Sequence, residues 1–383
     1  MKKASKHLST IVFLIFIFSV SVLFIALPKK EYSENEKRYL AEFPTLTVES
    51  FFSGDFGVDF EKYLSDHMPF RTFFVGLNSY YNNALGNPLS NGIYNCKDGY
   101  LINDPPTYER LDINFSIVAD FAKENDIKTS MVLAPSTGYV CSDLLPNKHI
   151  IYKDDEYFEK ANDILSKADV DFIDMREPLK NAYNDGTQVF YKTDHHWTAQ
   201  GAYLAYAELA DTLGYEKNEK ENYDITQYED FFGTTYSSSG FWLTKPDVIE
   251  TWESKNIKET EVSVEITEGE EVTKSDSMFY LDHLKNNDKY PVYLDGNHPY
   301  TTIKNSSLSK EKDSKKLLII KDSFAHTLTP FLADHFAEIT MIDMRYYKQN
   351  VTELLEKGDF DNVLFVYSID NLSTDSDLAF ILD

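Results

Sequence analysis

The chain has 383 residues and a formal net charge of −26, with 63 acidic side chains against 37 basic ones. At roughly 150 residues per domain, this length allows one large domain or two ordinary ones. A hydrophobic content of 42% excludes wholesale disorder. The strong negative charge excludes a nucleic-acid-binding protein, because phosphates would be repelled.

The first thirty residues predict a membrane anchor. Residues 11–27 read IVFLIFIFSVSVLFIAL, without a charge, at the short end of what spans a hydrocarbon core of about 30 Å. Three lysines precede this run, so the positive-inside rule keeps residues 1–10 in the cytoplasm, although two more lysines follow it. The residues after the run make a poor small-x-small cleavage site, so we favour an uncleaved signal anchor over a cleaved signal peptide. The protein is then single-pass, with its remaining residues outside the cytoplasmic membrane.

Residues 28–95 predict a membrane-proximal helical lead-in, with apolar residues at helical spacing over 60–85 and a break near Pro69. Arg71, which follows Asp66 in the run DHMPFR, is expected to make a structural ion pair.

Helices and strands alternate over residues 96–383. We predict helices at 115–125, 157–168, 198–213, after Ser323 and at 351–357, and strands at 128–134, 170–175, 188–192, 316–321, 338–344 and 362–367. Residues 215–315 interrupt this rhythm as a polar insertion or set of long loops, with an acidic β-like run over 259–272. The alternation predicts an α/β fold with a parallel sheet flanked by helices, whose sites form at the carboxyl ends of the strands.

Cys96 and Cys141 are the two cysteines, and both lie in the exported part. That compartment permits a disulfide between them, but sequence spacing does not decide the geometry, so the bridged and the free forms both stay open. Two cysteines alone cannot build a structural zinc site, and no glycine-rich phosphate loop is present. We therefore expect no cofactor.

The first chemically suggestive segment is the run TDHHWT over 193–198, between a predicted strand and a predicted helix. Asp194 and His196 lie two residues apart, so on an extended backbone their side chains point to the same side. A carboxylate beside an imidazole fixes its tautomer and stabilises the imidazolium. His195 is expected to point the other way or to serve the loop, Trp197 to pack in the core, and Thr198 to cap the following helix.

The second segment is the run KDSF over 321–324, which closes the apolar strand LLII and opens a helix. A serine at this junction is exposed at the strand end, where helix N-terminal amides can stabilise an oxyanion. Ser323 has no base close to it in sequence, and the first segment supplies one. Alone, each segment is equally compatible with a helix cap or a surface turn; together they favour an active site.

These two segments resemble the DHHW family, which is related to the SGNH-like alginate O-acetylation proteins of bacteria. The likeness extends to SENEKRYLAEFP (33–44), SGDFGVDFEKYLSDHMPFR (53–71) and KDGYLI (97–102). It covers most of the exported chain and is weakest over 215–290.

The resemblance implies a circularly permuted SGNH-hydrolase-like fold, with Ser323 as nucleophile, His196 as base and Asp194 as its orienting group. Where SGNH enzymes usually have a glycine before Asp-Ser, this chain has Lys321. It also implies an oxyanion hole made by the nucleophile's amide, a glycine and an asparagine. Candidates for the donors or for substrate contact are Asn371, Asn297, Gly296, Lys321 and Arg345.

The leading hypothesis is an extracytoplasmic O-acetyltransferase that modifies a polysaccharide through an acyl-enzyme. The resemblance also implies a multi-span membrane O-acyltransferase partner that delivers acetyl groups. A carbohydrate O-acetyl esterase would use the same triad, with water as acceptor. A non-catalytic polysaccharide-binding or assembly protein is a third reading, and a metal enzyme that uses Asp194, His195 and His196 is a fourth, although adjacent histidines rarely share one ion.

Overall fold

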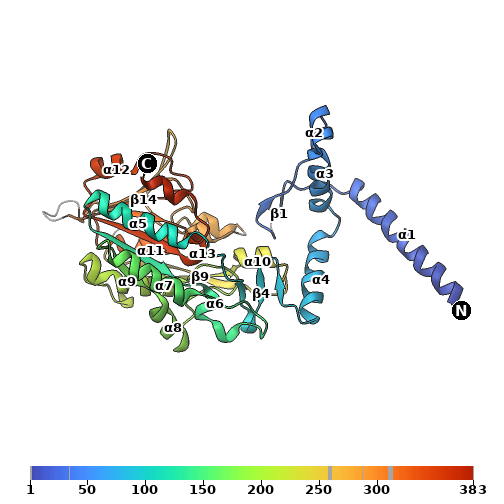
Figure 1. Ribbon diagram of the computed structural model, residues 1–383, viewed down its shortest axis with the longest axis horizontal. Coiled ribbons are helices and arrows are strands. Elements are labelled where there is room, and N and C mark those ends of the chain that lie inside the picture. Colours follow the sequence, from blue (N-terminus) through green and yellow to red (C-terminus); the bar gives the residue numbers. More distant parts are fainter. Residues whose placement is uncertain (1, 34, 258–260, 287, 309–313, 383) are drawn as a thin grey trace. The chain divides into compact units, whose positions relative to one another are not determined.

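The computed structural model describes residues 2–33, 35–257, 261–286, 288–308 and 314–382 (Figure 1). The chain forms two compact units. The first comprises Met1–Asn91 with Ser237–Leu243, and the second comprises Gly92–Tyr236 with Thr244–Asp383. The domain boundary predicted at residue 95 stays a prediction.

The first unit is mainly helical. It contains α1 (Lys2–Ala26), β1 (Tyr32–Ser33), β2 (Arg38–Tyr39), α2 (Val48–Ser53), α3 (Asp55–Asp66), α4 (Arg71–Ala84) and β3 (Leu89–Ser90). Within α1, His7–Ala26 is long and apolar enough to cross a membrane. The predicted break near Pro69 is confirmed, because α3 ends at Asp66 and α4 begins at Arg71.

Ion pairs tie the predicted lead-in together. The guanidinium of Arg38 donates to both carboxylate oxygens of Asp66, at 2.9 and 2.6 Å. Arg71 pairs with Glu36. The structural ion pair expected of Arg71 is therefore present, whereas its neighbour Asp66 binds the other arginine.

The second unit is built on an eight-stranded sheet of order β11-β10-β12-β14-β13-β15-β6-β7. The strands are β6 (Thr129–Ala134), β7 (Asp171–Asp174), β10 (Val262–Glu268), β11 (Glu271–Ser275), β12 (Tyr300–Asn305), β13 (Lys316–Lys321), β14 (Glu338–Ile342) and β15 (Asn362–Ser368). Strands β14, β13, β15, β6 and β7 pair in parallel. The other pairings are antiparallel. The predicted parallel sheet is confirmed over these five strands, and the polar 215–315 region adds β10, β11 and β12 to it in antiparallel pairing.

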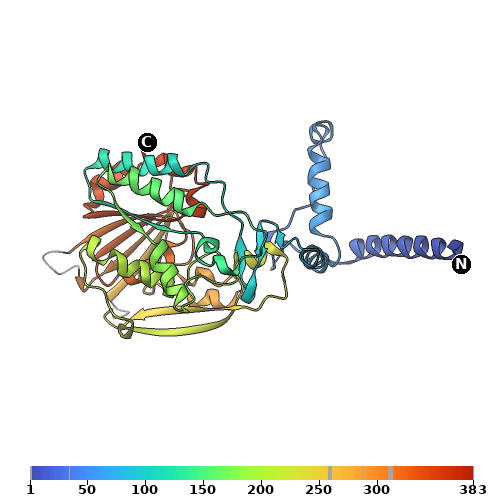
Figure 2. The same cartoon turned by 60° about the horizontal axis from the view of Figure 1, so that its bottom comes forward.

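Helices cover both faces of the sheet (Figure 2). On one face, α5 (Leu111–Asn125), α7 (Asp154–Ser166) and α12 (Val351–Gly358) pack on side chains such as Leu318, Ile320 and Phe365. The alternate residues Leu317 and Ile319 are also fully buried, against the layer that contains α9 (Ala199–Leu213) and α11 (Ala325–Leu332). Burial on both faces is why these strands read as continuous apolar runs.

The described residues also form further helices and strands. They are β4 (Ile93–Asn95), η1 (Lys97–Gly99), β5 (Leu101–Asn103), α6 (Thr137–Val140), η2 (Ser142–Leu144), α8 (Arg176–Asn184), η3 (Lys220–Asn222), β8 (Tyr223–Phe231), α10 (Thr234–Ser239), β9 (Asp247–Ser254), η5 (Leu281–Lys285), η6 (Tyr290–Val292), α13 (Ile369–Leu372) and η8 (Asp377–Leu382). Strands β8 and β9 form a separate antiparallel pair. The strand predicted at 188–192 is wrong: this stretch makes one isolated bridge, between Phe190 and Trp197. Of the predicted insertion, residues 258–260, 287 and 309–313 lie outside the described residues.

Candidate active site

Ser323 lies where β13 ends and α11 begins, and the preceding carboxylate fixes this junction. One oxygen of Asp322 accepts the amide of Phe324 at 2.8 Å. The other accepts the amide and the hydroxyl of Ser368, at 2.8 and 2.9 Å, and the side-chain amide of Asn371, at 2.8 Å. Asp322 therefore joins the carboxyl ends of β13 and β15 and holds the backbone around Ser323.

The loop 193–197 is held by a second buried carboxylate, that of Asp247 at the start of β9. Its oxygens accept the amides of Lys192 and Thr193 at 3.0 and 2.7 Å, the Thr193 hydroxyl at 2.6 Å and the Gln188 side-chain amide at 2.9 Å. The Thr198 hydroxyl then accepts the amide of Gly201 and caps α9, as predicted. The loop is thus fixed at both ends.

These two junctions bring a serine, a histidine and an aspartate into one hydrogen-bonded chain. Ser323 Oγ lies 2.7 Å from His196 Nε2. His196 Nδ1 lies 2.5 Å from Asp194 Oδ1, which also accepts the His196 amide at 2.9 Å. All three side chains are buried, with exposed fractions of 7%, 4% and 2%. The structure therefore brings together the three residues that the sequence singled out.

The second oxygen of Asp194 is also satisfied. It accepts the amide and the hydroxyl of Thr234, at 2.7 and 3.1 Å. Burial by itself raises the pKa of Asp194, but the neighbouring His196 and His195 and these hydrogen bonds outweigh it and hold the pKa well below its usual range. Gly233 makes the approach possible, because a Cβ there would lie 2.1 Å from the Cβ of Asp194. The carboxylate is thus ionised and fixed in orientation.

Aromatic rings hold the imidazole in place. Tyr290 stacks on His196 with ring centroids 3.7 Å apart, and its hydroxyl donates to the Ser323 carbonyl at 3.1 Å. Phe324 lies 5.1 Å from the same imidazole. Trp197 is fully buried, and its indole donates to the Phe324 carbonyl at 3.1 Å, which confirms the packing role predicted for it.

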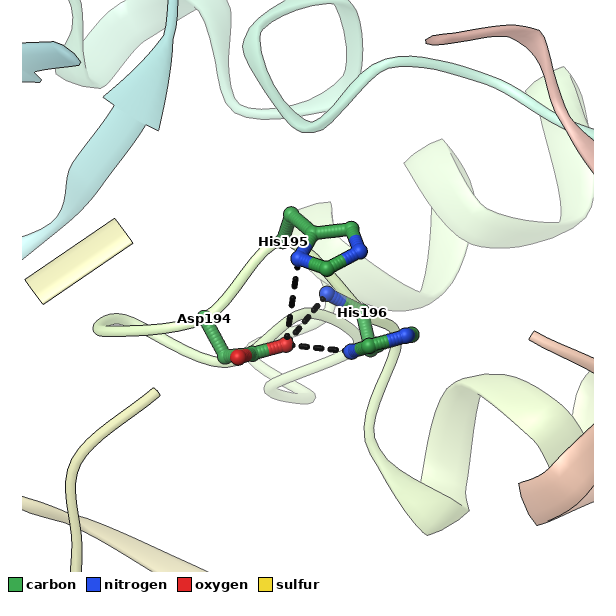
Figure 3. Close-up of side chains that lie close together, drawn as sticks. All are labelled: Asp194, His195 and His196. Carbon is green, nitrogen blue, oxygen red and sulfur yellow. Dashed lines mark hydrogen bonds and ion pairs between the residues drawn. The ribbon is translucent and has the colours of Figure 1, made fainter. Parts of the chain in front are cut away.

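His195 lies closer to this group than the sequence predicted. Its ring centroid is 3.9 Å from that of His196, and Figure 3 shows both imidazoles beside the Asp194 carboxylate. Asp194, His195 and His196 offer ligand atoms within 4.8 Å of one another, a spacing compatible with a metal ion. Several of these atoms already make hydrogen bonds: His196 Nδ1 to Asp194, His196 Nε2 to Ser323, and His195 Nδ1 to the Thr234 hydroxyl at 2.6 Å. The arrangement can therefore pass a proton from serine to imidazole without an ion.

The five candidates for oxyanion or substrate contact fall into two groups. Asn371 donates to Asp322, on the β15 side of Ser323. Lys321, Arg345, Asn297 and Gly296 lie on the β14 side. There, Lys321 Nζ donates to Asp343 at 3.1 Å and to His326 Nε2 at 2.8 Å.

Arg345 also binds Asp343, through two nitrogens at 2.8 and 2.6 Å, and donates to Asn297 at 3.2 Å. Gly296 follows Asp295 with a left-handed φ of 89°. Burial lowers the pKa of Lys321, and Asp343 acts against that shift. Each of the candidate side chains therefore supports its neighbours. Within the described part of the chain, the amide of Ser323 has no assigned acceptor, which leaves it available to an oxyanion.

The disulfide considered between Cys96 and Cys141 is not formed. Both are free thiols, with Cys141 buried and Cys96 partly exposed. Burial raises the pKa of the Cys96 thiol to about 12 and raises that of Cys141 as well.

Three supporting residues escaped the sequence analysis: Asp247, Gly233 and Tyr290. All lie in the 215–315 region, whose polar composition gave no regular pattern. A glycine before Thr234 and an isolated aspartate are common in loops, so the sequence held no signal that connects them with residue 194.

Residues 108–286 match the family model described as an SGNH hydrolase-like domain, acetyltransferase AlgX. This segment of the chain is therefore similar to SGNH hydrolase-like domains. The matched segment contains Asp194 and His196 and ends before Ser323. No curated protein matches the sequence.

Solved structures of two proteins share the fold of most of this chain. One is a DHHW family protein from Eubacterium siraeum, with a TM-score of 0.60 and 18% identity over 77% of this chain and 96% of that one. The other is PatB1 from Bacillus cereus, with a TM-score of 0.59 and 23% identity over 74% of this chain and 97% of that one. PatB1 with a sulfonyl adduct gives a TM-score of 0.60 at 22% identity, covering 75% and 97%.

Proposed function

We propose that this protein is an extracytoplasmic, serine-dependent O-acetyltransferase that modifies a cell-surface or exported polysaccharide. Ser323 would be the nucleophile, His196 the general base and Asp194 the group that orients the imidazole. The observation that carries the proposal is the hydrogen-bonded chain from Ser323 Oγ through His196 to Asp194, with links of 2.7 and 2.5 Å. A nucleophile, a base and a group that orients the base are what covalent acyl transfer requires.

In the first half-reaction, Ser323 Oγ attacks the carbonyl carbon of an acetyl ester while His196 Nε2 takes the serine proton. The ionised Asp194 stabilises the imidazolium, and the Ser323 amide donates to the oxyanion. Collapse of the tetrahedral intermediate breaks the bond to the leaving oxygen, which receives the proton from His196. The products are acetyl-Ser323 and the free alcohol of the donor.

In the second half-reaction, a sugar hydroxyl gives its proton to His196 and attacks the acetyl carbonyl. Ser323 leaves, recovers the proton from the imidazolium, and the acetylated sugar departs. Water as the acceptor would give hydrolysis instead, so transfer requires that the acyl-enzyme meets the sugar hydroxyl before water.

The proposed location rests on α1, whose apolar stretch His7–Ala26 contains most of the predicted anchor 11–27. We propose that this helix holds the protein in the cytoplasmic membrane, with residues 28–383 outside. An acetyl donor made in the cytoplasm would then have to reach the far side of the bilayer. A multi-span membrane O-acyltransferase is the proposed partner for that step.

The test is to trap the acyl-enzyme. The full chain in a lipid nanodisc is incubated with 4-nitrophenyl acetate and digested, and acetyl on the peptide that contains Ser323 is sought by mass spectrometry. We expect an adduct of one acetyl group on that serine, and its transfer to an added oligosaccharide to exceed acetate release. An adduct at another residue contradicts the assignment, and acetate release alone identifies an esterase.

A further inference from the structure

The first unit contains a solvent-open cavity of about 540 Å³, whose lining comes entirely from the ranges 36–91 and 237–242. This volume lies within the range of ordinary small-ligand sites, roughly 300–1,000 Å³. It belongs to the first unit, whereas Ser323, His196 and Asp194 belong to the second. The cavity is therefore a separate feature, which the proposed acyl transfer does not use.

One wall of the cavity is a short strap, residues 237–243, fixed on α4. The Trp242 indole donates to the Thr72 carbonyl at 2.9 Å, and the amide of Leu243 donates to the Tyr80 hydroxyl at 2.9 Å. Gly76 lets the indole approach, because a Cβ there would lie 2.7 Å from the Trp242 ring. The aromatic wall is thus held in place before any ligand arrives, which reduces the entropy lost on binding.

The charges at the cavity cancel. Arg38 and Arg71 both line it, but Arg38 is bound by Asp66 and Arg71 by Glu36. The rest of the lining is uncharged and consists of serine hydroxyls, asparagine amides and apolar or aromatic groups: Ser65, Met68, Phe74, Val75, Asn78, Ser79, Ser90, Asn91, Ser237, Ser238 and Trp242. The cavity therefore offers hydrogen-bonding groups and two aromatic side chains, without net charge, on a protein of charge −26.

Asn78 shows that the lining has unused hydrogen-bonding capacity. It lies on α4, and its side-chain oxygen accepts from Asn82 at 3.3 Å. Among the described residues, no acceptor is assigned to its side-chain nitrogen, which can donate two hydrogen bonds. An amide in this state, in a cavity lined by hydroxyls and aromatic side chains, suits a ligand that carries hydroxyl oxygens and apolar C–H faces.

We propose that this cavity binds a segment of a neutral glycan, as a second polysaccharide site apart from the catalytic centre. The volume and the neutral lining of the cavity are observed independently of the proposed function. Only the choice of a glycan among uncharged hydroxylated ligands rests on that function. Such a site would hold the polymer to the enzyme between successive acetylations. It would also explain how a chain of charge −26 retains its substrate, because binding at a neutral cavity requires no basic surface.

The test measures binding apart from chemistry. The full chain in a nanodisc of phosphatidylcholine, free of glycoside detergents that would compete, is titrated calorimetrically with cellohexaose, chitohexaose and hexagalacturonate. We expect at least one neutral hexamer to bind, with a dissociation constant below about 1 mM, and the anionic hexamer to bind at least tenfold more weakly. Absence of binding by both neutral hexamers, or tighter binding of the anionic one, overturns the proposal.

Variants then locate the binding. Asn78→Ala and Trp242→Ala should each weaken binding at least fivefold, and Trp242→Phe should restore part of the loss made by Trp242→Ala. Tyr81→Ala is the matched control, because this aromatic residue lies on the same helix, 61% exposed and outside the cavity. Asn78 is exposed, so its truncation leaves the fold intact even if the tryptophan variant fails to fold.

Two further results separate this site from the acyl-transfer site. Ser323→Ala should bind the hexamer as the unaltered protein does, and Asn78→Ala should still form the acetyl adduct on Ser323. Loss of glycan binding in Ser323→Ala with retention in Asn78→Ala would place the ligand at the catalytic centre and overturn the second site. Failure of the adduct alone would overturn the proposed function and leave the cavity result standing.

Discussion

The parallel and antiparallel halves of the central sheet differ in what lies at their strand ends. In the parallel half, the carboxyl ends of β13, β14, β15 and β6 meet at one edge, and a polar group lies at or just after each end: Ser323, Asp343, Ser368 and Ser136. In the antiparallel half, β10, β11 and β12 alternate in direction, so their carboxyl ends do not lie at the same side of the sheet. Strands of one sheet therefore differ in whether they can build an active site. Parallel strands bring their carboxyl ends to the same edge, whereas antiparallel strands do not.

The largest expected effect breaks the site in the parallel half. Ser323→Ala removes the oxygen that would form the proposed acyl-enzyme, so turnover of an acetyl ester should fall by at least about 1,000-fold. Ser263→Ala is the matched control, because this serine lies exposed on β10 in the antiparallel half. Both rates are measured with 4-nitrophenyl acetate. If turnover by Ser323→Ala stayed within tenfold of that of the unaltered protein, Ser323 would not be the nucleophile.

The second prediction concerns stability at the same strand ends. Asp154 accepts the Ser136 amide at 2.7 Å, and burial together with the nearby Asp370 raises its pKa to about 7. The unfolded chain releases this proton near pH 4, so between pH 4 and 7 the folded state binds more protons and stability falls as pH rises. At about 1.4 kcal/mol per pKa unit, the loss reaches up to about 4 kcal/mol above pH 7.

Asp154→Asn replaces the carboxyl group with an amide that does not titrate. The free energy of unfolding of this variant should therefore not fall between about pH 4 and 7 through residue 154. Urea denaturation at pH 5 and pH 8 measures it, with Asp155→Asn as the control, because the neighbouring side chain is 68% exposed. An equal pH dependence in the unaltered protein and Asp154→Asn would show that this carboxyl is not responsible.

The third prediction tests the loop that delivers His196 to the serine. Asp247→Asn keeps the shape of the side chain but gives it an amide that cannot accept all four of the hydrogen bonds from Gln188, Lys192 and Thr193. A small displacement of the base should lower kcat by about 10- to 100-fold and leave KM nearly unchanged. Asp224→Asn on β8 is the exposed control. A rise in KM at constant kcat would assign Asp247 to substrate binding instead.

The smallest effect is expected at the antiparallel edge. Val272 lies on β11, half-exposed, in the outermost strand of the sheet. Val272→Ser should change the free energy of unfolding by less than about 0.5 kcal/mol and leave turnover unchanged. Denaturation and ester turnover, measured together, check both values. A large loss of ester turnover in Val272→Ser would mean that strand β11 influences the site around Ser323.

Local patterns were sufficient for the helices and strands that bury a continuous apolar face. The segments predicted at 128–134, 316–321 and 362–367 are β6, β13 and β15 to within one residue, because strands buried on both faces are apolar throughout. The stretch 188–192 failed, because its residues serve the loop that Asp247 organises and do not pair with a strand. In the 215–315 region, β10 lies within the acidic β-like run predicted over 259–272 and β11 begins in it, whereas β12 was not predicted.

The sequence by itself singled out three candidate residues. Asp194 and His196 share one loop and Ser323 follows an apolar strand, so residue type and spacing pointed to both segments, and the resemblance to the DHHW family implied their roles. Only the tertiary structure decided that they meet, since Ser323 and His196 are 127 residues apart and their 2.7 Å contact depends on where two strand ends lie. It also decided what fixes that contact: Asp247, Gly233 and Tyr290 act through packing and hydrogen bonds between distant segments, which no local pattern encodes.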